Sequence, residues 1–280
     1  WDVNLNFSKN SNKVKKLVDG MDMFELEKAS WLDVQVAAKV GENYGSIIGP
    51  DFKRNENGDI LIDAATGLPM YDKTNHVLGN ASWDWTGGLV TTLTYKDLSL
   101  SAVFDVKVGA DLYSMSARAA YESGKSLETL QGREEWYHSE EQRKAAGIPK
   151  GSPDWTPTGG FIAPGVIDNG DGTYRENDIY INPEDYWMSV CRNAPSMFIY
   201  DNSYVKCREL TLSYRVPNKL FKGVIDNMTV SFVARNPFIV YKNIPNIDPD
   251  SNYNNTTGMG LEYGSLPSRR SYGFNISVKF

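Results

Sequence analysis

The segment Leu98-Ser-Leu-Ser-Ala-Val-Phe-Asp-Val-Lys-Val108 decides the fold class, because apolar and polar side chains alternate along its length. Successive side chains of a β-strand point to opposite faces of a sheet, so the alternation predicts a strand with one apolar and one polar face. The same period of two recurs in Leu32–Val40, Leu210–Val216, Met228–Arg235 and Tyr272–Phe280, and at the start in Val3, Leu5 and Phe7. The repeated pattern predicts an all-β protein.

Helical signals are few. Ser126–Ala146 predicts one or two helical turns within a long connection, since Gly147 and Pro149 stop a helix there. The Pro and Gly residues of Gly147–Gly172 predict an irregular loop. We therefore expect long, mostly irregular connections between the strands.

The connections are of two kinds. A tight turn at Lys96-Asp97 and a short segment containing Pro217 contrast with the long segments Ser114–Asn202 and Lys242–Arg270. If the strands run alternately up and down, both short connections fall at one end of the sheet. This asymmetry is typical of outer-membrane barrels, although a soluble β-sandwich also hides one face of each strand and remains the alternative.

Composition excludes several classes of protein. The 280 residues carry 35 acidic and 29 basic side chains, and a net charge of −6 argues against nucleic-acid binding. The longest apolar run has four residues, as in Met197–Tyr200, which is too short for a transmembrane helix. A spanning barrel needs no such run, so a membrane role stays open.

No catalytic, cofactor or metal site is expected. His76 and His138 are the only histidines, and the single pair of Cys191 and Cys207 permits a disulfide without requiring one. Asp168–Gly172 lacks the spacing of a calcium loop and predicts a β-turn instead. The adjacent acids Glu134-Glu135 and Glu140-Glu141 are expected to be solvated rather than catalytic.

Several blocks resemble, in order, the C-terminal part of the SusC/RagA-like TonB-dependent transporters of Bacteroidetes outer membranes. They are Gly58-Asp59-Ile60 to Gly67-Leu68-Pro69, Leu78-Gly79-Asn80 to Trp85-Thr86-Gly87-Gly88, Thr94 to Leu100, Leu130 to Glu135, Tyr204-Val205-Lys206 with Arg208 to Tyr214, Arg235-Asn236-Pro237-Phe238, Ile247-Asp248-Pro249-Asp250 and Pro267 to Tyr272. The sequence departs from the family at Ser82, Cys207 and Asn236-Pro237, which are interpreted as drift.

The resemblance implies the C-terminal portion of a large antiparallel transmembrane β-barrel of roughly 22 strands, with long extracellular loops. Residues 1–280 would all belong to this barrel part, and a signal peptide, TonB box and plug would lie upstream. The family imports oligosaccharides or peptides, is driven through TonB and works with a SusD-like surface lipoprotein. By resemblance, Ser114–Asn202 and Lys242–Arg270 would contribute to the contact with that lipoprotein. Too few strands are present to close a barrel, so the chain is expected to belong to a larger assembly.

The alternation predicts which side chains would face outer-membrane lipid. They are Leu98, Leu100, Phe104, Leu210, Leu212, Val230, Phe232, Phe274 and Ile276. The last strand, from Tyr272 to the aromatic residue Phe280, is predicted to carry the barrel-assembly signal. In a sandwich the same apolar face would instead form the core.

Trp83, Trp85 and Trp155 are candidate ligand or partner contacts, because aromatic faces stack on sugar rings. For Trp83 and Trp85 a place in an interfacial aromatic belt or in loop packing is favoured. Trp155 lies deep in a long connection and is the better candidate of the three. Two alternatives to active import remain, a secreted β-sandwich that binds glycans and a passive porin.

Overall fold

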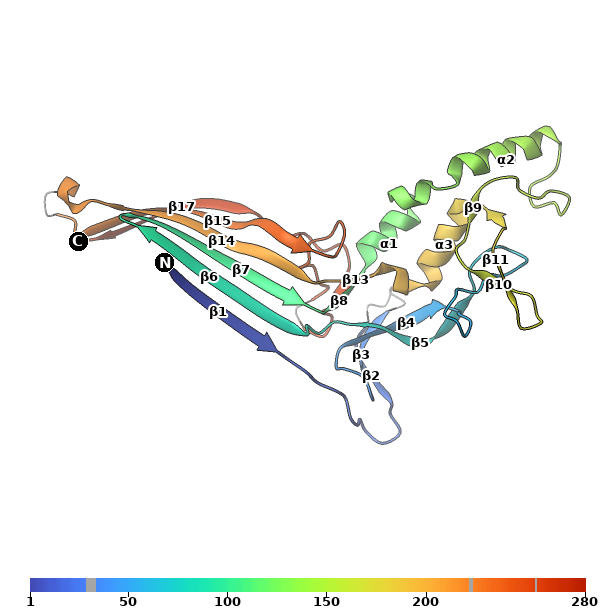
Figure 1. Cartoon of the computed structure of the whole chain (residues 1–280), viewed down its shortest axis with the longest axis horizontal. Helices are drawn as coiled ribbons and strands as arrows, with labels where there is room; N and C mark the ends of the chain where they lie inside the picture. The colour runs from blue at the N-terminus through green and yellow to red at the C-terminus, as the bar shows by residue number, and fades with distance from the viewer. Residues whose placement is uncertain (29–33, 222–223, 255) are drawn as a thin grey trace.

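The computed structural model describes residues 1–28, 34–221, 224–254 and 256–280. A long, narrow sheet forms one half of the molecule, and a lobe of helices and short strands forms the other (Figure 1). Most of the regular structure is antiparallel strand, which confirms the all-β prediction.

The long sheet, called the wall sheet below, has six antiparallel strands in the order β1-β6-β7-β14-β15-β17. Their bounds are β1 Asp2–Lys9, β6 Trp85–Tyr95, β7 Leu98–Val108, β14 Tyr204–Val216, β15 Asn227–Lys242 and β17 Ser271–Lys279. Strands of 9–11 tilted residues suffice to cross a bilayer, and β6 and β7 each have 11. The sheet is open, since β1 and β17 form its two edges within the described residues.

The register divides the wall sheet into an apolar face and a polar face. One row of the apolar face consists of Leu93, Leu100, Leu212, Phe232 and Phe274, which pair in turn across five strands. All nine side chains predicted to face lipid share this face, because they stand an even number of residues from that row. The neighbouring row of the polar face consists of Thr94, Ser99, Ser213, Ser231 and Asn275. That the apolar face meets lipid stays a prediction.

All long connections leave the wall sheet at one end. Residues 10–84, 109–203 and 243–270 depart from the end nearest the lobe, whereas the Lys96-Asp97 turn and the segment after Val216 lie at the opposite end (Figure 1). The last segment contains the short 3-10 helix η3 (Asn218–Phe221). Lys96 has a positive φ of 54°, as a tight hairpin turn requires. The asymmetry expected from the loop lengths is thus confirmed.

The first long connection forms a second antiparallel sheet beside the lobe. Its strands are β2 Met23–Lys28, β3 Gln35–Lys39, β4 Ser46–Phe52 and β5 Tyr71–Asn80, in that order. The expectation that the strand at Leu32–Val40 has one solvent-exposed face is wrong, because Gln35, Val36, Ala37 and Ala38 are all buried. Both faces of β3 are covered by neighbouring parts of the fold, which alternation alone does not reveal. Leu32 and Asp33 lie outside the described residues.

The second long connection folds into the lobe, although most of Gly147–Gly172 within it is irregular, as predicted. It contains β8 Asp111–Ser114, α1 Met115–Glu122, η1 Leu127–Leu130, α2 Arg133–Ala145, β9 Phe161–Ile162, β10 Val166–Asp168, β11 Tyr174–Glu176, β12 Tyr180–Ile181, α3 Pro183–Asn193, η2 Pro195–Phe198 and β13 Ile199–Asp201. The prediction of one or two helical turns at Ser126–Ala146 was too short, since α2 alone has 13 residues. Acids in its first turn and Arg143 and Lys144 in its last turn complement the helix dipole.

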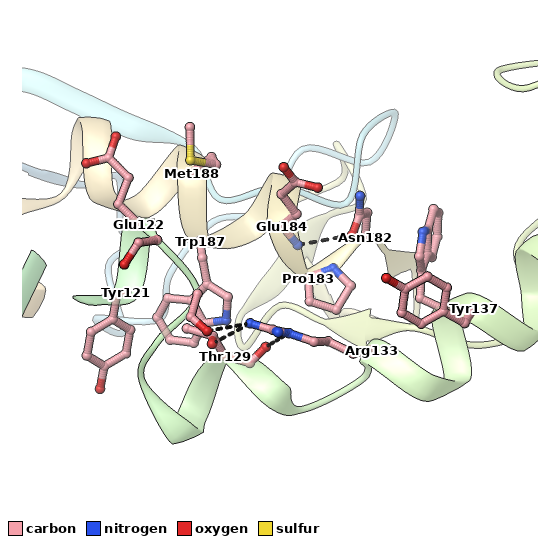
Figure 2. A pocket seen from close by; sticks show the side chains of 13 residues that line it. Tyr121, Glu122, Thr129, Arg133, Tyr137, Asn182, Pro183, Glu184, Trp187 and Met188 are labelled. Carbon is pink, nitrogen blue, oxygen red and sulfur yellow. Dashed lines mark hydrogen bonds between the residues drawn. The ribbon is translucent and has the colours of Figure 1, made fainter. Parts of the chain in front are cut away.

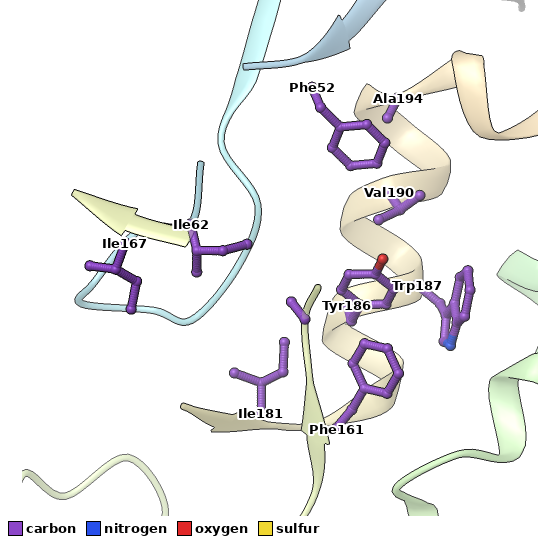
Figure 3. Packing of buried hydrophobic residues seen from close by; sticks show 10 residues of the cluster. Phe52, Ile62, Phe161, Ile167, Ile181, Tyr186, Trp187, Val190 and Ala194 are labelled. Carbon is purple, nitrogen blue, oxygen red and sulfur yellow. The ribbon is translucent and has the colours of Figure 1, made fainter. Parts of the chain in front are cut away.

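Helix α3 begins with local signals that explain its position. Asn182 is its N-cap and accepts a hydrogen bond from the backbone N–H of Glu184 at 3.1 Å, while Pro183 occupies the first turn. Its apolar side packs into a cluster drawn in Figure 3, with Phe161 and Tyr186 centroids 4.5 Å apart. A second cluster, around Phe198, joins α1 and α3 to β3 and β4. The lobe therefore has an apolar core of its own.

The turn expected at Asp168–Gly172 is present, and Asn55–Asp59 forms a second turn. The backbone N–H of Asn55 donates to Asp59 O at 3.0 Å, and β10 pairs with β11 across the expected turn. Gly58, Gly170 and Gly172 have positive φ. Within the described part of the chain, no helix is long and apolar enough to cross a membrane.

Candidate functional site

The polar face of the wall sheet meets the lobe at a buried cluster of charges. Residues 243–270, called the tie loop below, turn back over this face after β15. Lys206 of β14 has 2% of its side chain exposed and places Nζ 2.6 Å from Asp250 Oδ2 and 3.1 Å from Asp248 Oδ1. Ser268 Oγ also binds Lys206 Nζ. Three residues of the tie loop thus satisfy one buried ammonium group.

Arg208 extends the cluster to the neighbouring strand. The register of β14 against β7 and β15 shifts between Cys207 and Glu209, where a bulge bends the strand. The guanidinium of Arg208 contacts Asp105 of β7 through Nη2 at 2.5 Å and Asp250 through Nη1 at 2.5 Å. Buried charges are tolerated only when paired in this manner.

The two tie-loop carboxylates are held in their charged form. Burial alone would raise the pKa of Asp250, but hydrogen bonds from Arg208 and Lys206 outweigh it and hold that pKa well below the ordinary 3.8. Burial opposes ionisation of Asp248 as well, and bonds from Ser268, the Asp250 backbone and Lys206 lower its pKa. The tie loop is therefore attached to the polar face of the wall sheet through ionised side chains.

The tie loop also holds the lobe and the second sheet. It contains β16 (Leu261–Glu262), whose Leu261 pairs in parallel with Tyr113 of β8. The buried carboxylate of Glu262 accepts bonds from the Ser114 hydroxyl at 2.8 Å and the Ser116 hydroxyl at 2.6 Å. Before β16, Asn254 and Thr257 donate to Glu27 of β2. One loop thus fixes the position of three parts of the molecule.

Trp83 lies beside this cluster. Its ring meets Tyr204 edge to face, with centroids 5.8 Å apart, and Lys107 Nζ lies 5.5 Å from the Trp83 ring centre. Tyr204 itself is buried and donates to Asp250 at 2.9 Å. Trp83 therefore packs where the polar face ends, and a role in ligand contact stays a prediction.

Trp85 lies on the apolar face of the wall sheet. It packs against Phe7, with centroids 5.6 Å apart, at the lobe end, while Tyr95 and Tyr214 lie at the turn end. Trp85 and Tyr95 stand at the two ends of β6, ten residue steps apart. At about 3.3 Å per residue and a tilt of about 40° they span roughly 25 Å, the height of the apolar band of a barrel. The spacing supports the interfacial-belt interpretation of Trp85.

Trp155 lies in the segment between α2 and β9. This segment is bonded back to α2, since Thr158 donates through its backbone N–H to the Ser139 hydroxyl at 3.0 Å. The Trp155 ring is half-buried, and its Nε1 is buried without a hydrogen-bond partner among the described residues. Trp83 and Trp85 line one cavity of about 350 Å³ next to Asn80, whereas Trp155 lies apart from them in the lobe, so the structure does not combine all three in one site.

A pocket that the sequence did not suggest opens in the lobe between α1, η1, α2 and α3. Its cavity of about 340 Å³ is small but within the range of ligand sites. In Figure 2, Arg133 reaches from α2 toward Thr129, with Trp187 of α3 on one side and Tyr137 on the other. The helix-start signal at Asn182-Pro183 would have located α3, but no sequence rule places α2 opposite it.

The cysteines form no disulfide. Cys191 and Cys207 are both buried free thiols, and burial raises the pKa of Cys191 in α3 to about 12, so that thiol stays protonated. Within the described ranges, no group of three or more His, Cys, Asp or Glu side chains is arranged to hold a metal ion.

Comparison with known proteins gives consistent relatives. No family model matches the chain. TonB-dependent receptor P3 of Formosa agariphila is 25% identical over the whole of this chain, which covers 27% of that receptor. TonB-dependent receptor P26 of the same organism is 23% identical over 84% of the chain, which covers 20% of it. The chain thus spans about a quarter of the length of the curated relatives it matches.

Solved structures show the same fold. The RagAB peptide transporter aligns with 99% of this chain at a TM-score of 0.58 and 18% identity, and the chain covers 26% of that transporter chain. The RagAB peptide importer in the "open-open" state gives the same TM-score at 19% identity. With its ordered sequence blocks and its two-faced antiparallel sheet, the chain is similar to part of the SusC/RagA-like TonB-dependent receptors of the bacterial outer membrane.

Proposed function

We propose that the protein takes part in TonB-dependent import of oligosaccharides or peptides across the outer membrane. The observation that carries this proposal is the open wall sheet, with one apolar and one polar face and every long connection at one end. A spanning sheet needs its apolar face against lipid and its polar face toward a lumen. The chain would supply part of the barrel wall and the extracellular side of the path.

The tie loop gives this part of the wall a more specific role. Asp248 and Asp250 fasten it to Lys206 and Arg208 on the polar face, which would be the lumen side of a barrel. The loop would therefore shape the outer mouth of the import path rather than extend freely into solvent. Partner contact through the same connection would involve its more exposed residues, such as Tyr263 and Leu266.

A SusD-like lipoprotein is the proposed partner, and TonB the proposed source of energy. The partner is proposed from the resemblance and from the likeness to the RagAB peptide importer, and TonB from the likeness to TonB-dependent receptors. The lobe, folded around its own core at the end of the wall sheet, offers a docking surface. No catalytic role is proposed.

Uptake of labelled substrate by cells tests the proposal. A strain lacking the receptor is complemented with the intact gene, and uptake of fluorescent neutral oligosaccharides and short peptides is measured with and without a protonophore. Active import predicts uptake that needs the gene and stops with the protonophore. Uptake that survives the protonophore would indicate a passive porin instead.

A β-sandwich that binds glycans makes a different prediction about detergent. Its apolar face would be internal, whereas Leu5, Tyr95 and Phe274 are more than half exposed on the wall sheet. The protein extracted from membranes should precipitate when detergent is removed. A monodisperse detergent-free species by light scattering would support the sandwich.

A further inference from the structure

We propose that the lobe pocket between α1, η1, α2 and α3 is a binding site for a neutral saccharide ring. This site lies in the lobe, apart from the polar face of the wall sheet. The inference does not depend on what passes through the barrel.

An unused donor in the pocket points to a ligand. The Trp187 side chain is 8% exposed, and its Nε1 is buried without a hydrogen-bond partner among the described residues. A buried N–H normally finds an acceptor, and leaving it unpaired is costly. Trp187 lines the pocket, so a ligand placed there can supply the acceptor.

Arg133 provides a second donor in a fixed orientation. Its Nε donates to Thr129 O at 2.7 Å, and its Nη2 donates to the Thr129 hydroxyl at 2.7 Å and to Gly124 O at 3.0 Å. These three bonds hold the guanidinium at the floor of the pocket in Figure 2. They leave Nη1 without a hydrogen-bond partner in the part of the chain that the structure describes.

Acceptors and aromatic surfaces complete the lining. Glu122 and Glu184 carry carboxylates, and Asn182 lies between α3 and α2. Tyr137 has 69% of its side chain exposed, so its ring is accessible to a ligand, and the half-buried Trp136 stands beside it. An aromatic face of this kind can support the apolar side of a sugar ring.

The charges favour a neutral ligand with hydroxyl groups. An anion would meet Glu122 and Glu184, and a cation would meet Arg133 and leave the Trp187 N–H unpaired. A hydroxyl both donates and accepts, so a ring carrying several can satisfy carboxylates and N–H groups together. Extended peptides more often pair with a strand edge, and helices form the walls of this pocket.

Titration calorimetry tests the site on the receptor purified from its host. Lauryldimethylamine oxide is the detergent of choice, because its head group carries no sugar. The probes are maltotriose, cellotriose, xylotriose and mannotriose, with trialanine as the peptide comparison. We expect at least one trisaccharide to bind, with slowed hydrogen exchange in residues 121–137 and 182–188.

Two variants and a matched control define the result. Trp187→Phe keeps a ring but removes the donor, and Tyr137→Ala removes an exposed surface with little risk to folding. Each should weaken binding roughly three- to tenfold. His138→Ala, at the neighbouring exposed position of α2, should leave binding unchanged.

Three outcomes would overturn the proposal. The first is that no trisaccharide binds. The second is that a trisaccharide binds but neither Trp187→Phe nor Tyr137→Ala weakens the binding. The third is that trialanine, and not a trisaccharide, slows hydrogen exchange in residues 121–137 and 182–188. Uptake measurements are not part of this test. Failure here therefore leaves the import proposal standing, and failure of import leaves the pocket untouched.

Discussion

Lys206 is the residue on which the attachment of the tie loop depends most. Replacing it by Met keeps the length of the side chain but leaves the buried side chain of Asp248 and the partly buried side chain of Asp250 beside an apolar group. Breaking a buried ion pair by removing one partner costs roughly 3–5 kcal/mol. Urea unfolding of the receptor in micelles should show a loss of this size for Lys206→Met, together with faster protease cleavage within residues 243–270.

An exposed ion pair on the same sheet is the matched control. Arg235 contacts Glu209 at 3.3 Å, with 68% and 39% of the two side chains exposed. Such pairs contribute about 0–1 kcal/mol, so Arg235→Gln should change stability little. Equal losses for Lys206→Met and Arg235→Gln would mean that burial of the cluster is not what holds the loop.

The pH dependence of the cluster has a definite sign. Asp250 has a folded-state pKa below its ordinary 3.8, because Arg208 and Lys206 outweigh the effect of burial. A carboxyl with a lowered pKa stabilises the fold fully above its ordinary pKa and loses that contribution as the pH falls through the folded value. The difference in unfolding free energy between wild type and Asp250→Asn should be constant from pH 7 to about 5 and shrink below about 4. A difference that grew on acidification would contradict the assignment.

At the scale of single elements, β17 tests which face of the wall sheet meets lipid. Phe274 is 79% exposed on the apolar face, and Asn275 is its neighbour on the polar face. An Arg at mid-membrane on a lipid-facing position costs roughly 2–4 kcal/mol, and far less toward a lumen. Phe274→Arg should therefore lower the fraction of heat-modifiable, folded receptor in outer-membrane vesicles, whereas Asn275→Arg should not. The opposite order would reverse the two faces.

The start of α2 depends on a glycine for two separate reasons. Gly132 has φ +79°, and a Cβ there would lie 2.7 Å from the backbone of Gly160. Gly147, just after the helix, has φ +72° with open space around it. The left-handed conformation costs roughly 1–2 kcal/mol for other residues, so Gly147→Ala should lose about that and Gly132→Ala clearly more. Both losses of stability can be measured by thermal unfolding, with hydrogen exchange of the α2 amides as the readout. Similar losses for the two variants would show that the backbone of Gly160 moves to make room for the added Cβ.

Alternation predicted the wall strands closely, because each strand borders two different environments. Leu98–Val108 has the same bounds in sequence and structure, and the tight turn at Lys96 follows directly. Alternation could not predict β3, since a strand covered on both faces is governed by its tertiary neighbours. It could not predict the cluster of Lys206 with Asp248 and Asp250 either, because the partners are 42 and 44 residues apart and no local rule joins them.

At the scale of the whole molecule, the wall sheet and the lobe differ in where their apolar side chains lie. The wall sheet exposes apolar side chains along its length, while the lobe buries its own around Phe161, Phe198 and α3. Within the described residues, the tie loop contacts the polar face of the wall sheet, β8 of the lobe and β2 of the second sheet through the bonds described above. A load applied to the lobe by a partner would reach the wall through this loop and through the two short connections that join β7 to β8 and β13 to β14.

The edges of the wall sheet carry the last prediction. Strands β1 and β17 each pair on one side only within the described chain, and an unpaired backbone group in lipid costs several kcal/mol. The relatives are about four times as long as the matched region, so their remaining length can supply further strands. In the receptor purified from its host membrane, the amides of residues 2–9 and 271–279 should all be protected from hydrogen exchange. Residues 1–280 produced alone in micelles should exchange alternate amides of these strands rapidly, while β7 and β14 stay protected. Equal protection of the edge strands in both preparations would show that the six strands need no others.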